Sequence, residues 1–343
     1  MAFAGSARVR ITLMLSIVVA AIAFVTGSPL PAPAAPGAGT NTPDPEGGTP
    51  SLRQALENAS KGYTAAKIKL ANSARRQAEL TKQQRVTEAR VAVLSKDVQI
   101  LAAAAYRGGQ MNLLSAALDS RSVPTFLDKS AMIDQLSWQN NQKITALKNA
   151  RAELEKQKAK IVGEIKIQQA QEKAMAKRKT DAEKALAAVG GGASGGFAGG
   201  SAAAKPAPRN ADGSFPSESC SLDDPTSDGC LTPRMKHAYT EARLAGFTRY
   251  THCYRDASFG EHPKGRACDF AAAQDGFGGA ATGGERTYGN RLAAWCINNA
   301  DELGVLYVIW YRQIWMPSTG WRAYDGGGSP SAAHTNHVHL SVQ

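Results

Sequence analysis

The chain has 343 residues and a formal net charge of +11, and this length leaves room for two domains. The charge is uneven, because residues 51–190 hold 25 Lys and Arg against 13 Asp and Glu, whereas residues 191–343 hold 13 against 14. All six His and all five Cys lie after residue 215, which excludes histidine and thiol chemistry from the basic middle segment.

Residues 1–34 are predicted to form an export signal. Arg8 and Arg10 precede an apolar run from Ile11 to Val25, which is short for a membrane span of about 20 residues but suits a signal peptide. Ala32-Pro-Ala34 offers small residues for cleavage, and retention as an uncleaved anchor is the alternative. We therefore expect a secreted or cell-surface protein, in which disulfides can form and nucleic acid is not the partner of the basic charge. Lipid head groups and acidic wall polymers remain as anionic partners.

Residues 35–50 are rich in Pro and Gly, and we expect them to be a disordered lead-in. A regular apolar spacing follows them. From Leu56 to Ala105, mainly apolar residues recur at alternating intervals of three and four, with polar residues between them. This pattern predicts a coiled-coil helix of about seven heptads.

A second long helix is predicted from about Pro124 to Val189, with a seam interrupted by Arg151, Lys158 and Gln168. Two long helices joined by a compact tip favour an antiparallel coiled-coil hairpin over residues 51–189. Such a hairpin serves either as a spacer or dimerising stalk, or as a partner-binding or autoinhibitory arm.

Residues 190–217 are rich in Gly, Ala and Pro and are predicted to be a flexible linker. Beyond it, residues 218–343 are expected to form an α+β domain with a small antiparallel sheet, large enough to bury its own core. Capping residues and periodicity predict helices over 233–246 and 290–303 and strands over 247–254, 266–270, 305–310 and 336–342.

The cysteines suggest two disulfides. Cys220 and Cys230 bracket a short polar loop, which predicts a local bridge. Cys268 faces away from Asp269 in its strand, so Cys253 on the neighbouring predicted strand is the favoured partner, and a Cys268–Cys296 bridge is the alternative.

Two segments supply the donors of a candidate metal site. His262 lies seven residues before Asp269, with Pro263 and Gly265 between them to bend the backbone. His337 and His339 stand two residues apart in a predicted strand, so that both face one side about 6.6 Å apart. Two His and one Asp form a catalytic zinc set that leaves a fourth position for water.

The run Gly260-Glu-His262-Pro-Lys-Gly265-Arg-Ala267-Cys-Asp269 resembles the zinc-binding element of the D-Ala-D-Ala carboxypeptidase, lysostaphin and hedgehog-like superfamily, with Gly260 where Ser is usual. The resemblance implies His262, Asp269 and His339 as Zn²⁺ ligands and His337 as the catalytic histidine. The carboxypeptidase branch has a Glu at the position of Asn336, so the pattern is more similar to the endopeptidase branch, which implies His334 in the substrate cleft.

Two further segments show resemblances. Cys253-Tyr-Arg255-Asp is similar to an element of that superfamily whose Arg grips the substrate, which implies a catalytic and substrate-binding role for Arg255.

The segment Ala105-Tyr-Arg-Gly-Gly-Gln-Met-Asn-Leu-Leu, with Pro124-Thr-Phe-Leu-Asp128, resembles the hairpin tip of secreted peptidoglycan hydrolases of Gram-positive bacteria. That similarity implies a module that restrains the hydrolase or docks it to a membrane or divisome partner.

These features together predict a secreted zinc metallopeptidase that hydrolyses amide bonds in the peptide stems of peptidoglycan and is regulated or localised by its hairpin. The alternative is a non-catalytic protein of the same fold that binds wall material or activates a partner hydrolase. A glycan hydrolase is a weaker alternative, because no pair of carboxylates stands out in the C-terminal domain.

Overall fold

The computed structural model describes residues 48–108, 119–120, 122–197, 199 and 202–343. The predicted export signal, nearly all of the predicted lead-in and the hairpin tip at 109–118 lie outside these residues. The described chain combines a long helical hairpin with antiparallel sheet, which confirms the predicted α+β class. Among the described helices, none has the combination of length and hydropathy that crossing a membrane requires.

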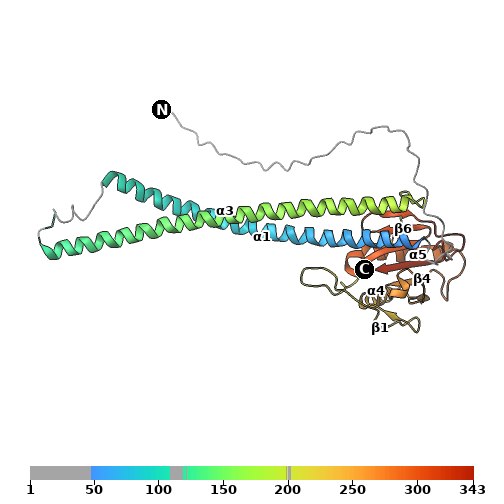
Figure 1. Cartoon of the computed structure of the whole chain (residues 1–343). Helices are drawn as coiled ribbons and strands as arrows, with labels where there is room; N and C mark the ends of the chain where they lie inside the picture. The colour runs from blue at the N-terminus through green and yellow to red at the C-terminus, as the bar shows by residue number, and fades with distance from the viewer. Residues whose placement is uncertain (1–47, 109–118, 121, 198, 200–201) are drawn as a thin grey trace, which may run out of the picture. The chain divides into compact units, whose positions relative to one another are not determined.

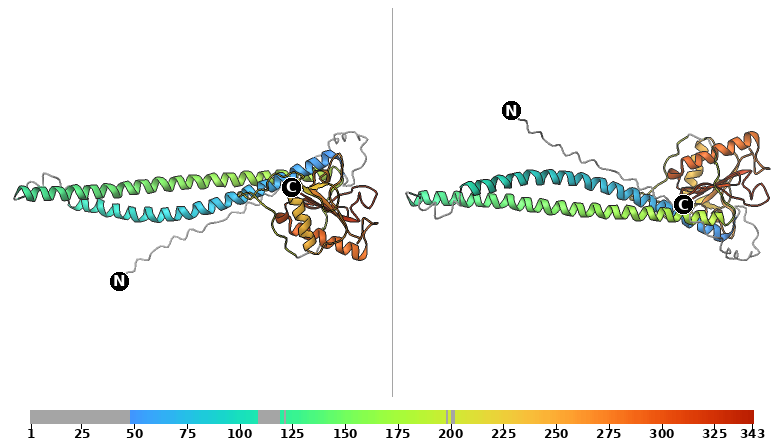
Figure 2. Two further views of the ribbon diagram at one scale, coloured as in Figure 1. Left: turned by 90° about the horizontal axis from the view of Figure 1, so that it is seen from below. Right: turned by 90° about the horizontal axis from the view of Figure 1, so that it is seen from above.

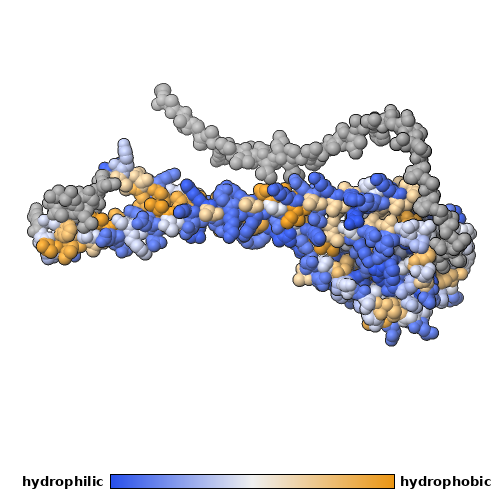
Figure 3. All heavy atoms as spheres, viewed as in Figure 1, coloured by the Kyte–Doolittle hydropathy of each residue, from blue (hydrophilic) through white to orange (hydrophobic). Residues whose placement is uncertain are grey.

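The hairpin consists of α1 (Pro50–Gly108) and α3 (Val123–Ala187), which run side by side (Figure 1). Ser122 caps α3 by accepting a hydrogen bond from the backbone N–H of Thr125, with proline in the first turn. Gln168, which interrupts the predicted seam, donates to Gln77 Oε1 across the hairpin at 2.7 Å. At this interruption the two helices are therefore joined by a polar contact, and mainly hydrophilic residues cover the middle of the hairpin in Figure 3.

The C-terminal part contains a six-stranded antiparallel sheet in the order β3-β4-β8-β5-β6-β7. Its strands are β3 (Thr251–His252), β4 (Ala267–Ala271), β5 (Val305–Trp310), β6 (Gln313–Met316), β7 (Gly320–Ala323) and β8 (His337–Val342). The helices are α4 (Pro233–Leu244), η1 (His262–Lys264), α5 (Gly283–Asn298) and α6 (Ala300–Leu303), and β1 (Leu222–Asp223) pairs only with β2 (Cys230–Leu231).

The sequence located β4, β5, β8, α3 and α4 to within about two residues, but some other bounds were wrong. The strand predicted over 247–254 shrinks to Thr251–His252, and β6 and β7 were not predicted. Helix α5 begins seven residues before the predicted start, within a glycine-rich stretch of low helix propensity. Packing explains this stretch, because Gly289 lies against the ring of Trp310, where a Cβ atom would clash.

The two faces of the sheet are covered by different parts of the chain. One face packs on α4 and α5 in a core that includes Phe270, Trp295, Trp310 and Leu340. The other face packs on the base of the hairpin (Figure 2). This second core joins residues of α1 and α3 to residues of β5, β6 and the loop after β7: Leu52, Leu56, Ala59, Ala182, Leu186, Leu306, Tyr307, Ile309, Ile314, Met316 and Tyr324. The C-terminal domain therefore buries its own core, as expected, and shares a second core with the hairpin.

The segment predicted to be a flexible linker is packed against the domain where it is described. The carbonyl of Gly192 accepts a hydrogen bond from the N–H of Ala323 at 2.8 Å, beside β7. Farther along, the N–H of Ala204 donates to Asn299 Oδ1, and the N–H of Ala207 donates to the carbonyl of Glu302, both at 2.8 Å. These contacts make the described part of 190–217 a strap along the domain.

The shared core yields a stability prediction. Leu56 is 2% exposed, so Leu56→Ala should lower the free energy of unfolding by about 2–5 kcal/mol through lost burial and the cavity left behind. Val86→Ala, at a position 67% exposed on the same helix, is the matched control and should change it by less than about 0.5 kcal/mol. Urea unfolding followed by tryptophan fluorescence measures both, and equal midpoints for the two variants would contradict a shared core.

Glu57 of α1 yields a pH prediction. Burial raises its pKa, but hydrogen bonds from Lys61, Arg266 and Lys264 outweigh burial and hold the pKa at about 2, below the ordinary 4.5. Because the pKa of Glu57 is depressed in the folded state, the stabilisation that its carboxylate gives the folded protein is complete above pH 4.5 and is lost as the pH falls towards 2. The loss should be on the order of 2–3 kcal/mol. Urea unfolding at pH 6 and pH 3 measures the effect: between these two pH values the free energy of unfolding should fall less for Glu57→Gln than for the wild type. Glu79→Gln, which alters an exposed carboxylate of the same helix, is the control and should show the same fall as the wild type.

Candidate metal centre

The candidate metal ligands meet on one face of the sheet because of how β4 pairs with β8. Asp269 stands directly opposite His339 in this antiparallel pair. Since alternate residues of a strand share a face, Asp269, His337 and His339 lie on the face opposite to the core around Phe270 and Leu340. This arrangement confirms the predicted alternation of β8.

His262 reaches the same place from η1, a single 3-10 turn. Gly265 ends this turn in the left-handed region, with φ +65°. A side chain there would also collide with Cys220 and the backbone of Cys230. The turn between the two halves of the motif therefore requires glycine.

Three donor atoms form a small triangle. His262 Nε2 lies 3.2 Å from both Asp269 Oδ1 and His339 Nδ1, and the last two atoms are 2.8 Å apart. All three residues are buried. Tetrahedral ligands about 2.0 Å from a zinc ion are about 3.3 Å apart, so the donor set and its spacing fit such an ion with little movement. His₂Asp donors also suit other divalent metals.

A protein group orients each imidazole through its second nitrogen. His262 Nδ1 contacts the carbonyl oxygen of Cys253, which directs Nε2 into the triangle. His339 Nε2 lies 2.7 Å from Ser341 Oγ, which leaves Nδ1 for the triangle. Such outer partners fix ring orientation in metal sites. The sequence placed Ser341 on this face, but the carbonyl of Cys253 has no sequence signal.

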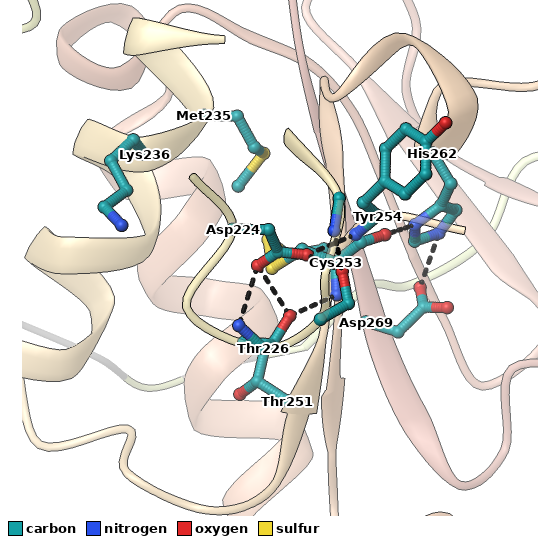
Figure 4. The surroundings of a disulfide bond; sticks show 12 residues. Asp224, Thr226, Met235, Lys236, Thr251, Cys253, Tyr254, His262 and Asp269 are labelled. Carbon is teal, nitrogen blue, oxygen red and sulfur yellow. Dashed lines mark hydrogen bonds and ion pairs between the residues drawn. A yellow bond between two sulfur atoms is a disulfide. The ribbon is translucent and has the colours of Figure 1, made fainter. Parts of the chain in front are cut away.

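The partner of His262 is itself held by the disulfide-closed loop (Figure 4). The Cys253 N–H donates to Thr226 Oγ1, and the Tyr254 N–H donates to Asp224 Oδ2, both at 2.8 Å. Asp224 and Thr226 lie between Cys220 and Cys230, which are bonded, and Cys253 is bonded to Cys268. Both favoured disulfide pairings are thus present, and Cys296 is a buried free thiol.

His337 and His334 line the triangle without joining it. His337 Nε2 is 3.4 Å from Asp269 Oδ1, and its Nδ1 is 2.8 Å from Asn336 Oδ1. The His334 ring centroid lies 4.8 Å from that of His337, and its Nε2 is buried with no hydrogen-bond partner among the described residues. Its φ of +50° is unusual for a non-glycine residue. Burial lowers the pKa of His337 to about 4 and that of His334 well below its ordinary 6.5, so both rings are neutral at pH 7.

Arg255 contacts the carboxylate of the candidate ligand Asp269. Its Nη1 donates to Asp269 Oδ2 at 2.6 Å. Burial raises the pKa of Asp269, but His262, His337 and Arg255 lower it well below its ordinary value, so the carboxyl group is ionised. The substrate-gripping role of Arg255 remains a prediction.

Other polar residues stay outside the triangle. Glu261 pairs with Lys264 at 3.1 Å and with Arg266. His237 Nε2 contacts the carbonyl of Lys205, outside the cluster.

The cluster is almost completely enclosed in this conformation. Its five residues are between 0% and 4% exposed: His262, Asp269, His334, His337 and His339. Phe277 lies on one side, with its ring centroid 5.3 Å from that of His337, and Tyr307 lies on another, with its ring centroid 5.5 Å from that of His339. A polymeric substrate therefore needs a rearrangement of these surroundings to reach the triangle.

Comparison with known proteins relates only the C-terminal domain to a family. The family model described as "VldE, C-terminal domain" matches residues 227–335. No curated protein and no solved structure matches the chain significantly. The matched range includes His262, Asp269 and His334 and ends before His337 and His339. The chain is thus similar to that family over less than half of its length.

Proposed function

We propose that this protein is a zinc-dependent peptidase that hydrolyses amide bonds in the peptide stems of peptidoglycan at the cell surface, with a helical hairpin that regulates or localises it. The observation that supports this most is the triangle of His262, Asp269 and His339, whose donor atoms lie within 4.8 Å of one another. Three protein ligands leave one position for chemistry, as in catalytic zinc sites.

The substrate class rests on the resemblance of His262, Gly265, Ala267 and Asp269 to the zinc element of the D-Ala-D-Ala carboxypeptidase, lysostaphin and hedgehog-like superfamily. The position of the carboxypeptidase glutamate is held by Asn336, whose Nδ2 donates to the carbonyl of Gly278 at 2.9 Å. A carboxamide is too weakly basic to serve as the general base that a glutamate would supply. We therefore favour internal cleavage of the wall peptide.

The residues beside the triangle have separate tasks in this proposal. A bound divalent metal supplies a Lewis acid that polarises the scissile carbonyl and acidifies water. His337 accepts a proton at Nε2, because Nδ1 is engaged by Asn336 Oδ1. Arg255 is near enough to neutralise negative charge that develops on the substrate, once a metal takes over part of its pairing with Asp269.

A second candidate function is favoured by the enclosure of the cluster. Structural zinc sites are closed by a fourth protein ligand, and His337 Nε2, 3.4 Å from Asp269 Oδ1, is near enough to become that ligand after a small movement. The domain would then be a metal-stabilised module that binds wall material or activates a partner hydrolase. The catalytic and structural proposals assign different roles to the same His337.

Metal analysis of the full chain tests the site. The wild type should contain about one zinc per chain, and His262→Ala and His339→Ala should each lose it, because two remaining ligands hold zinc weakly. His237→Ala is the matched control, since that imidazole lies outside the cluster. Elemental analysis after dialysis measures the content. A folded wild type that takes up no added zinc would exclude both candidate functions.

His337→Ala separates the two candidates. If the centre is catalytic, the variant should keep its zinc and lose cleavage of purified muropeptides by about 100-fold or more. If His337 is a fourth ligand, zinc should be lost and the wild type should cleave no muropeptide. Mass spectrometry of the digests, with zinc content measured on the same samples, distinguishes these results.

A further inference from the structure

We propose that helix α1 completes the metal centre, with Glu57 as a positioning residue for His262 and Arg53 as a positioning residue for His339. The inference rests on the proposed metal site. Positions 53, 57 and 60 follow one another at intervals of four and three, so they lie on one face of α1. Each of the three side chains makes a polar contact with the C-terminal domain.

Glu57 holds the turn that presents His262. Its Oε1 accepts from Arg266 Nη2 at 2.7 Å, and its Oε2 accepts from Lys264 Nζ at 3.1 Å. Lys264 belongs to η1 itself, and both cations also pair with Glu261, the residue directly before His262. The Glu57 side chain is only 10% exposed, so solvent screens these ion pairs weakly. One carboxylate of α1 thereby holds the end of the turn directly, and its start through the two cations that also pair with Glu261.

Arg53 holds the ring that lies on His339. Its Nη1 donates to Tyr307 Oη at 3.0 Å, and its Nη2 donates to Tyr324 Oη at 3.2 Å. The Tyr307 ring lies nearly parallel to the imidazole of His339, with an interplanar angle of 11°. Because Arg53 is 6% exposed and fixes the far end of this ring, it limits how far His339 can tilt.

Ser60 supports the same ring from the backbone. Its Oγ donates to the carbonyl of Leu306 at 2.7 Å. The register of β5 shifts between Val305 and Tyr307, so that Leu306 and Tyr307 both belong to the core shared with the hairpin. A bulge of this kind leaves backbone groups without strand partners, and α1 supplies one for this carbonyl.

These contacts distinguish α1 from a mere packing layer. Helix α3 contributes the apolar side chains of Ala182 and Leu186 to the shared core. Its ion pair with the sheet, between Glu183 and Arg322, ends on β7 and not on a residue of the cluster. The polar contacts of α1 instead end on a turn that contains one metal ligand and on a ring that stacks on another. Loss of a group that hydrogen-bonds a metal ligand typically weakens metal binding by about 10- to 100-fold. Glu57 and Arg53 act on the ligands through an intervening residue, so we expect an effect in the lower part of this range.

The test uses the full chain with Glu57→Gln and Arg53→Met. Zinc affinity is measured by competition with a chromophoric chelator, and ligand geometry is measured from the visible spectrum of the chain loaded with Co²⁺. Both variants should bind zinc more weakly, in the lower part of the range of about 10- to 100-fold, and show altered cobalt bands. Lys67→Met is the matched control, because Lys67 on the same helix pairs with Asp301 at 2.6 Å without contacting the cluster, and it should behave as the wild type.

Two results would overturn the proposal. If folded Glu57→Gln and Arg53→Met bind zinc with the wild-type affinity and show the wild-type cobalt spectrum, α1 only packs against the domain. Unchanged affinity with faster muropeptide cleavage would make α1 a restraining arm. Should Arg53→Met fail to fold, Tyr307→Phe removes the acceptor that joins Arg53 to the ring but keeps the ring itself, and a loss of affinity in the same direction is expected of it. A wild type that binds no metal would instead overturn the metal centre itself, which separates the two failures.

Discussion

The pairing of β4 with β8 is the constraint on which the rest of the site depends. In this register Asp269 faces His339, while Phe270 and Leu340 face the core formed with α4 and α5. A slip of one residue would exchange the two faces, burying a carboxylate and imidazoles among aliphatic side chains at a cost of several kcal/mol. The apolar core thus specifies the register, and the register brings the candidate metal donors together.

The enclosed carboxylate of Asp269 also explains why so many polar groups converge there. An ionised group 2% exposed needs compensating charge and hydrogen bonds. Arg255 and the imidazoles around it supply them. A bound divalent cation would take over much of this compensation, which would free Arg255 for another partner. The same geometry is therefore consistent with a stable metal-free protein and with a reactive loaded one.

The sequence predicted those parts of the site whose spacing is local. His262 and Asp269 share one turn and strand, and His339 lies in a strand with clear alternation. The contributions of Arg53 and Glu57 could not be predicted, because they lie more than 200 residues from their partners and read as ordinary polar positions of a coiled coil. The strap formed by the described part of 190–217 was missed for a related reason, since a Gly- and Ala-rich composition indicates flexibility unless tertiary hydrogen bonds hold it.

That strap also bears on how the sheet ends. An exposed edge strand offers unpaired N–H and carbonyl groups to any other extended chain and is a common starting point for aggregation. Here the edge strand β3 is only two residues long, and β7 at the opposite edge is met by Gly192, Ala193 and Ser194. The segment that leaves the hairpin therefore covers the edge of the sheet. A substitution that releases it from β7 would expose a four-residue edge strand to pairing with a neighbouring molecule.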